Sequence, residues 1–137
     1  MSNPVFVDAS ALIALADPGD PAHGRAVGFL GHLEGPLATS NLVLLEAASQ
    51  VAARAGNRQA TEMLERLRAE SALKIYFVDP ELERKGWEHF VRHARKTLTP
   101  RQAMAMALMK ELGIRMVFTF EEAYREAGFV AVPLTQE

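Results

Sequence analysis

The segment NPVFVDASALIAL, residues 3–15, decides the fold of this chain. Residues 4–8 form a short apolar run typical of a buried strand, and the pattern then continues with helical spacing until the breaker DPGDP at residues 17–21. A carboxylate, Asp8, lies at the junction between strand and helix. Because a buried carboxylate is costly without a partner, its position calls for a functional explanation.

Apolar runs and helical patterns alternate along the rest of the chain. Further strands are expected at 35–39, 73–79, 113–120 and 129–133, the last at a sheet edge, with helices at 21–34, 41–55, 58–70, 80–96, 100–112 and 121–127. Ser40 or Asn41 is expected to cap one long helix, and Thr99, with Pro100 in the first helical position, to cap another. This order predicts an α/β sandwich around a central parallel sheet, in a single domain spanning 1–137.

The composition is that of an ordinary globular protein. Hydrophobic residues make up 49% and charged residues 23% of 137 residues, and the formal net charge of −2 gives no overall basic field. The absence of cysteine excludes disulfides and thiolate catalysis, so a metal ion would need oxygen or imidazole ligands. With no apolar run of about 20 residues and no signal-peptide pattern, we expect a cytoplasmic protein without membrane contact.

Three acids are expected to meet at one edge of the sheet. Asp8 and Glu121 follow the first and fourth strands at their carboxyl ends, where α/β proteins bind ligands. Glu46 lies in the apolar segment 41–49 and is expected to be buried, where it needs an arginine or a shared cation. Carboxylates held together repel one another unless a hard cation is present, and oxygen ligands suit Mg2+ or Mn2+. This arrangement favours metal-assisted phosphoryl transfer.

Four segments of the chain, in this order, resemble motifs of a known family: VFVDASALIAL (5–15), TSNLVLLEAAS (39–49), LTPRQAMAMALMKELGI (98–114) and VFTFEEAYREAGF (117–129). Together they resemble the PIN domains of the bacterial VapC-like ribonuclease toxins over nearly the whole chain. The resemblance implies a three-layer α/β/α fold, Mg2+ or Mn2+ bound by three or four acids, and cleavage of RNA. It also implies a homodimer and a small antitoxin protein, whose segment lies along the helical hairpin 41–70 and blocks the acids with a basic side chain.

The resemblance also assigns residues to the site. Asp8 and Glu46 match the first two acids of the family, and Glu121 stands where a fourth, usually Asp, is found. Gln102 replaces the third acid and offers a carbonyl oxygen but no charge. We therefore expect one metal ion held by Asp8, Glu46 and Glu121, with Gln102 as the fourth catalytic position of a site whose activity is weakened.

Two hydroxyls and a basic stretch are candidates for contact with substrate. Ser10 and Thr119 are expected to position water, metal or substrate, or to act as capping and turn residues. The basic stretch consists of Arg92, Arg95, Lys96 and Arg101. It leads toward the proposed cleft, where it would contact RNA phosphates. Alternatively, it forms a solvated helix face.

Other interpretations fit the sequence less well. His89 and His93 have a spacing that binds zinc, but Phe90 stands where the zinc-protease pattern needs Glu. A phosphoaspartyl phosphatase needs a second Asp two residues after Asp8, where Ser10 stands. Two functions remain: a metal-dependent endoribonuclease, the toxin of a toxin–antitoxin pair, or a non-catalytic PIN-like module that binds RNA or a protein partner.

Overall fold

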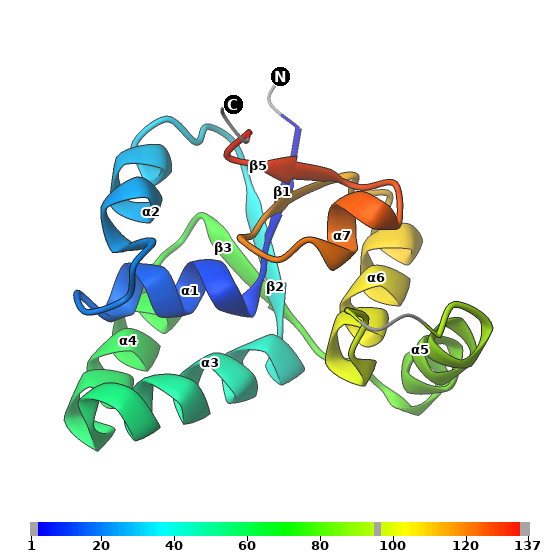
Figure 1. Cartoon of the computed structure of the whole chain (residues 1–137), viewed down its shortest axis with the longest axis horizontal. Helices are drawn as coiled ribbons and strands as arrows, with labels where there is room; N and C mark the ends of the chain where they lie inside the picture. Colours follow the sequence, from blue (N-terminus) through cyan, green and yellow to red (C-terminus); the bar gives the residue numbers. More distant parts are fainter. Residues whose placement is uncertain (1–2, 95–96, 135–137) are drawn as a thin grey trace.

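A computed structural model describes residues 3–94 and 97–134 of the chain, and its centre is a five-stranded sheet. The strands are β1 (Val5–Val7), β2 (Leu37–Ser40), β3 (Leu73–Tyr76), β4 (Met116–Phe118) and β5 (Val130–Val132). Their order is β3-β2-β1-β4-β5, and all four pairings are parallel. The carboxyl ends of all the strands therefore lie along one edge of the sheet (Figure 1).

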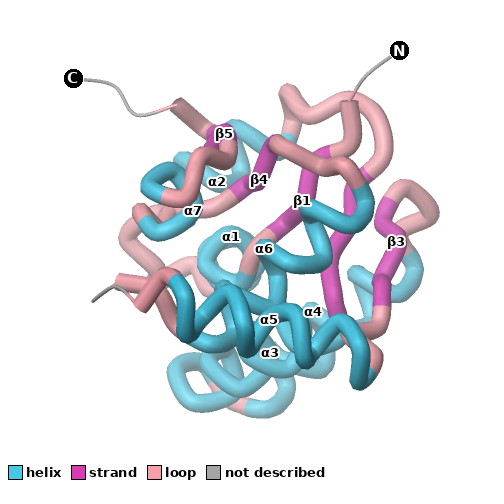
Figure 2. Tube along the Cα trace, turned by 90° about the vertical axis from the view of Figure 1, so that its right-hand side faces the viewer, coloured by secondary structure: helices cyan, strands magenta, loops and turns pink. Residues whose placement is uncertain are grey.

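Helices cover both faces of this sheet. They are α1 (Ala9–Ala16), α2 (His23–Leu30), α3 (Asn41–Ala55), α4 (Asn57–Ala69), α5 (Pro80–Arg92), α6 (Pro100–Leu112) and α7 (Ala123–Glu126). Figures 1 and 2 show α1 and α2 on one side of the sheet and α5 and α6 on the other. The predicted three-layer α/β/α fold with a central parallel sheet is confirmed.

The long helices begin where the sequence places their caps. The Ser40 hydroxyl accepts a hydrogen bond from the amide of Val43 at 3.1 Å and starts α3. Thr99 caps α6, with Pro100 at the first helical position. Gly113 ends α6 at a φ of 72°, a left-handed conformation that favours glycine. The local sequence therefore sets both ends of α6, the helix that brings Arg101 to the carboxyl edge of the sheet.

Some predicted boundaries are too long. The third strand stops at Tyr76 rather than at residue 79, because the amide of Val78 turns to the Asn41 side chain at 2.9 Å instead of to a neighbouring strand. The helix predicted over 21–34 is the shorter α2, and α5 ends at Arg92. Residues 95 and 96 of the predicted helix 80–96 lie outside the described residues.

The packing of α5 against α6 is close. Gly86 of α5 faces Met104 of α6, and a Cβ atom at position 86 would overlap the Met104 side chain. Met104, Met106 and Met109 are all buried. The two helices can approach this closely only because position 86 has no side chain.

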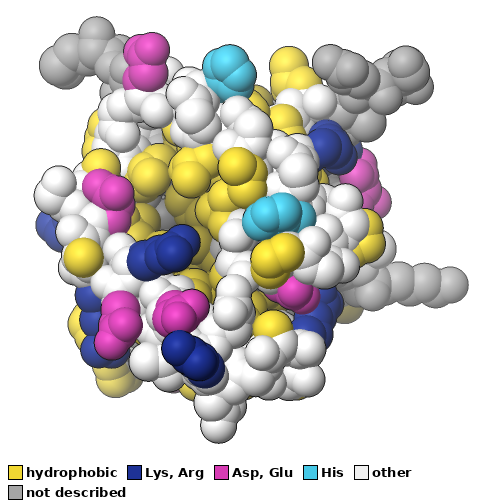
Figure 3. Space-filling view, turned by 90° about the vertical axis from the view of Figure 1, so that its left-hand side faces the viewer, with side chains coloured by type: hydrophobic (Ala, Val, Ile, Leu, Met, Phe, Trp, Pro, Cys, Tyr) yellow, Lys and Arg dark blue, Asp and Glu magenta, His cyan; other side chains and the backbone are white. Residues whose placement is uncertain are grey.

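Charges of both signs lie on the side of the molecule that carries α2. Figure 3 shows apolar side chains gathered in a recess on this face, with basic and acidic side chains around it. A polyanion would meet individual cations here rather than a continuous basic surface. Among the described residues, no helix is long and apolar enough to cross a membrane.

Candidate active site

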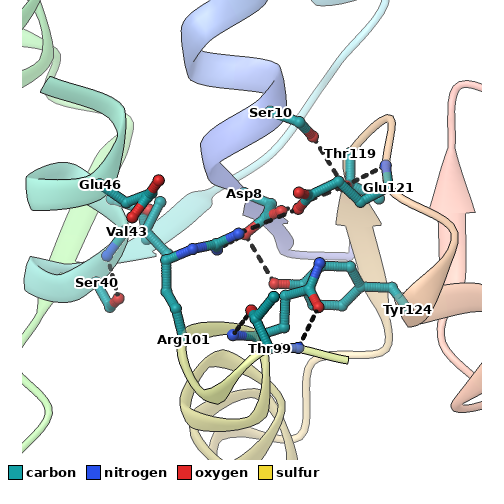
Figure 4. A network of polar contacts seen from close by, with 12 residues as sticks. Asp8, Ser10, Ser40, Val43, Glu46, Thr99, Arg101, Thr119, Glu121 and Tyr124 are labelled. Carbon is teal, nitrogen blue, oxygen red and sulfur yellow. Dashed lines mark hydrogen bonds and ion pairs between the residues drawn. The ribbon is translucent and has the colours of Figure 1, made fainter. Parts of the chain in front are cut away.

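The Asp8 carboxylate is fully buried at the junction between β1 and α1. Its Oδ1 atom accepts a hydrogen bond from the Tyr124 hydroxyl at 2.7 Å and another from Nη1 of Arg101 at 2.7 Å. The Thr119 hydroxyl approaches Oδ2 at 3.3 Å. Figure 4 shows these groups converging on Asp8 from α6, α7 and the loop after β4. The burial of this charge is thus compensated by one cation and two hydroxyls.

Arg101 bridges two acids. While Nη1 contacts Asp8, Nη2 lies 3.2 Å from Oε1 of Glu121. The Arg101 side chain is only 16% exposed. Burial opposes its charge, but the negative charges around it, led by that of Asp8 and joined by that of Glu121, together outweigh burial and raise the pKa of Arg101 above its usual value. The guanidinium therefore stays charged between the two carboxylates.

The two acids differ in how strongly they hold a proton. Burial raises the pKa of Glu121 to about 7, and the hydrogen bond and negative charge of Asp8 act in the same direction. Burial alone would also raise the pKa of Asp8. The hydrogen bond with Glu121, the charge of Arg101 and the hydrogen bond from Tyr124 act together against burial and hold the pKa of Asp8 below its usual value. Asp8 is thus the stronger acid of the two, and both carboxyl groups contact the same positive charge, that of Arg101.

Two hydroxyls fix the loop that carries Glu121. The hydroxyls of Ser10 and Thr119 lie 3.0 Å apart. Ser10 Oγ accepts from the amide of Phe120 at 2.9 Å, and Thr119 Oγ1 accepts from the amide of Glu121 at 3.1 Å. Thr119 is buried beneath the site, which favours the role of a turn residue over contact with substrate. Ser10 lines the pocket described below and has access to a ligand.

Gln102 does not present its carbonyl oxygen to the acids. That oxygen accepts a hydrogen bond from the amide of Thr99 at 2.8 Å, while the Thr99 hydroxyl accepts from the amide of Gln102 at 3.2 Å. The side chain thus completes a capping box at the start of α6. In this structure the helix cap uses the oxygen that was expected to serve as a neutral metal ligand. A hydrogen bond with Gln102 instead acts to lower the pKa of Glu121.

Glu46 is half-buried, and the prediction that it is buried is wrong. The apolar segment around it does not pack on all sides, since its neighbour Leu45 is 66% exposed. Glu46 borders a pocket of about 210 Å³, and its Oε2 atom accepts from Gln50 at 2.9 Å. Arg101 and Glu121 line the same pocket. Asp20, Arg54 and Phe120 also line it.

The predicted acids are therefore assembled around a cation. Asp8 and Glu121 share the guanidinium of Arg101, and Glu46 borders the pocket into which that guanidinium reaches. Three carboxylates suit a hard divalent cation by their chemistry. In the described parts of the chain, however, no three acids or histidines lie close enough to hold one together. The three carboxylates have the chemistry to bind a metal ion. In this structure, however, Asp8 and Glu121 are arranged around the guanidinium of Arg101.

The other candidates lie apart from the acids. The rings of His89, on α5, and His93, directly after α5, lie 4.6 Å apart and are tilted by 45°, but within residues 3–94 and 97–134 no third ligand joins them. Arg92 is exposed, whereas Arg95 and Lys96 lie outside the described residues. Only Arg101 of the basic stretch is seen to reach the acids.

One residue of the site was not predicted from the sequence. Tyr124 lies three positions after Glu121 in the fourth segment, and its hydroxyl is fully buried against Asp8. A tyrosine in an apolar segment usually finds a hydrogen-bond partner when it is buried, so its position was a usable signal.

Comparisons with known proteins identify the family of this chain. The sequence model of the PIN domain matches residues 5–130. The chain is 32% identical over 128 residues to the 23S rRNA-specific endonuclease VapC20 of Mycobacterium tuberculosis, covering 93% of this chain and 97% of the relative. The crystal structure of Mycobacterium tuberculosis VapC20, described as a Sarcin-Ricin loop cleaving toxin, matches with a TM-score of 0.87 and 31% identity over 92% of this chain and 96% of that one.

A more distant structure shares the fold alone. DNA-bound VapBC from Salmonella typhimurium matches with a TM-score of 0.64 at 18% identity, over 96% of this chain and 97% of that chain. The family match spans the four segments quoted above and strands β1 to β4, and it ends at the first residue of β5. The chain is a member of the PIN domain family.

Proposed function

We propose that this chain is an endoribonuclease that hydrolyses RNA with one bound Mg2+ or Mn2+ ion and acts as the toxin of a toxin–antitoxin pair. The observation that carries the proposal is the pair Asp8 and Glu121, which hold a single cationic group at the carboxyl edge of the sheet. Glu46 borders the same pocket and supplies a third carboxylate. Such a charge arrangement suits the stabilisation of a phosphodiester transition state.

The substrate class follows from the relative. VapC20 is a 23S rRNA-specific endonuclease, and the identity of 32% extends over nearly the full length of both chains. We therefore propose ribosomal RNA as the substrate, which would place the protein in the cytoplasm. A pocket of about 210 Å³ is too small to enclose a nucleotide, so the RNA would lie across its mouth with one phosphate group inside.

The roles of the side chains follow from their contacts. Asp8, Glu121 and Glu46 would hold the metal ion, which when bound polarises the phosphate and lowers the pKa of an attacking water. Tyr124 fixes the Asp8 carboxylate through its hydrogen bond, and Ser10 holds the loop of Glu121 through the amide of Phe120. The catalytic groups are thus oriented by buried neighbours before any ligand arrives.

An aromatic side chain at the pocket would bind an unpaired base. Phe120 lines the pocket, and the guanidinium of Arg25 lies 5.3 Å from its ring centroid. Phe118 supports the ring from the core, with a centroid distance of 6.0 Å. Within the described part of the chain, Arg25 forms no ion pair that would hold it away from RNA. Aromatic rings and arginine planes are the groups on which unpaired RNA bases stack.

Protein partners are also part of the proposal. Structural neighbours include VapBC complexes, which supports an antitoxin whose segment lies along α3 and α4 and reaches the acids with a basic side chain.

We also infer a homodimer. The α5 helix exposes Trp87 at 45% and Val91 at 74%, an apolar surface that suits a subunit contact. Sedimentation of the wild type and of Val91→Asp tests this, since a dimer through α5 predicts that only the variant is monomeric.

The substrate is tested by incubating intact ribosomes with the purified protein and Mn2+ and mapping cut sites on the ribosomal RNA by primer extension. The proposal predicts cleavage at a single unpaired loop, which requires added metal ion. Absence of cleavage, combined with tight binding of RNA, would favour the alternative of a non-catalytic RNA-binding module. Replacement of Glu121 by Gln provides the inactive control.

A further inference from the structure

Arg101 occupies the place of a metal ion. Its two terminal nitrogens contact Asp8 at 2.7 Å and Glu121 at 3.2 Å, and its side chain is 16% exposed. In the described residues no three acids or histidines are arranged to hold a metal ion. We propose that Arg101 and a divalent cation are alternative partners of the Asp8–Glu121 pair, so that Arg101 must leave before the ion binds. This inference rests on the proposed function, because it concerns the metal ion of that site.

The two cations exclude each other for reasons of space and charge. Carboxylate oxygens bind Mg2+ at about 2.0–2.1 Å, so an ion shared by Asp8 and Glu121 would lie where the guanidinium now lies. A divalent ion beside a retained guanidinium would also bring like charges together at a largely buried position. Sharing the pair between both cations is therefore strongly unfavourable.

Asp8 also requires one of the two cations at all times. Its other side-chain partners, Tyr124 and Thr119, are neutral hydroxyls. Across the described residues, Arg101 is the only cationic group in ion-pair contact with this buried carboxylate. A buried charge without a counter-ion is costly, so the departure of Arg101 has to coincide with arrival of the metal ion.

The pocket beside the acid pair can accept the displaced Arg101 side chain. It is the second residue of α6 and lines the pocket, which Glu46 and Asp20 also border. Rotation of the side chain alone would carry the guanidinium toward these acids without moving the helix. In that position its planar fork would face a phosphate group entering the pocket, the ligand that arginine binds in a bidentate manner.

The decisive test is calorimetric titration of the full chain with Mn2+, without RNA. Arg101→Gln is compared with Arg54→Gln, which removes the same charge from the same pocket but contacts Asp20 rather than the acid pair. The inference predicts at least tenfold tighter Mn2+ binding by Arg101→Gln than by Arg54→Gln, equal to about 1.4 kcal/mol. Without Mn2+, Arg101→Gln should also melt below the wild type, and saturating Mn2+ should remove this difference.

The other outcomes separate this inference from the proposed function. Equal or weaker Mn2+ binding by Arg101→Gln overturns the inference, and if the wild type still cleaves RNA, the proposed function survives. Absence of Mn2+ binding in the wild type and both variants overturns the inference together with the metal-dependent function. If Arg101→Gln does not fold, Arg101→Lys replaces it, since lysine keeps the charge but cannot bridge both acids. It should bind Mn2+ more tightly than the wild type, and unchanged binding would contradict the inference.

Discussion

The hydroxyl of Tyr124 donates a hydrogen bond of 2.7 Å to Oδ1 of Asp8, and the two residues lie 116 positions apart in the chain. Both side chains are fully buried. This contact ties α7 to the end of β1 and fixes the carboxylate in a single orientation. It also means that the stability of the core and the geometry of the site depend on the same hydrogen bond.

Tyr124→Phe should destabilise the fold by about 1.5–3 kcal/mol, because it removes a hydrogen bond to a buried charged group. Urea unfolding followed by circular dichroism measures the change. Tyr76→Phe is the control, since that hydroxyl forms no hydrogen bond among the described residues. Equal unfolding free energies for the two variants would show that the Tyr124 hydroxyl contributes nothing.

Gly86→Ala should destabilise the protein by about 1–3 kcal/mol, because the added methyl group would overlap Met104 and force α5 away from α6. Gly28→Ala is the matched control, since it also lies in a helix and an added Cβ there meets nothing within 4 Å. That change should be neutral or stabilising by up to about 1 kcal/mol. Thermal unfolding of both variants separates the two cases, and a neutral Gly86→Ala would contradict the close approach.

Gln102→Glu should strengthen Mn2+ binding. Glutamate retains the capping box with Thr99 and adds a negative charge beside Glu121, so the helix start is preserved while the site gains an acid. We expect a gain of tenfold or more in affinity by calorimetry, together with faster RNA cleavage. Gln59→Glu adds the same charge outside the pocket and should leave Mn2+ affinity unchanged. An equal effect of both substitutions would mean that only the overall charge matters.

Phe120→Ala should weaken RNA binding by roughly 5- to 150-fold, the range that corresponds to about 1–3 kcal/mol for one stacked base. The measurement is fluorescence anisotropy with a labelled RNA loop, in a Glu121→Gln background that prevents cleavage. Phe77→Ala provides the control, because this ring is 74% exposed and does not line the pocket. Similar affinities for the two variants would remove Phe120 from the RNA site.

The sequence predicts those features that depend on neighbours in the chain. The caps at Ser40 and Thr99 are readable because each cap uses an amide within three residues. The placement of Asp8 and Glu121 at one edge is readable because parallel strands align their carboxyl ends. By contrast, the partner of Arg101 is Asp8, 93 positions away, and no local pattern reports such a contact.

Burial is similarly hard to read for a single residue. The apolar segment around Glu46 predicts a buried helix, but Leu45 faces solvent and Glu46 faces a pocket. The pattern of a helix specifies which residues share a face, whereas the neighbours that cover each face come from distant elements. Gln102 is different, because its contact is local. Its oxygen completes the capping box with Thr99, three residues earlier, and the sequence alone could have indicated this contact.

Cleavage of RNA by Glu121→Gln and Glu122→Gln in the presence of Mn2+ tests the central claim most directly. The two substitutions are identical and adjacent, but Glu121 contacts Arg101 at the pocket while Glu122 is exposed and paired with Arg125. The account predicts that Glu121→Gln loses at least 100-fold in cleavage rate, equal to about 2.7 kcal/mol in the barrier, while Glu122→Gln cleaves like the wild type. Equal cleavage by the two variants would contradict the assignment of this pocket as the active site.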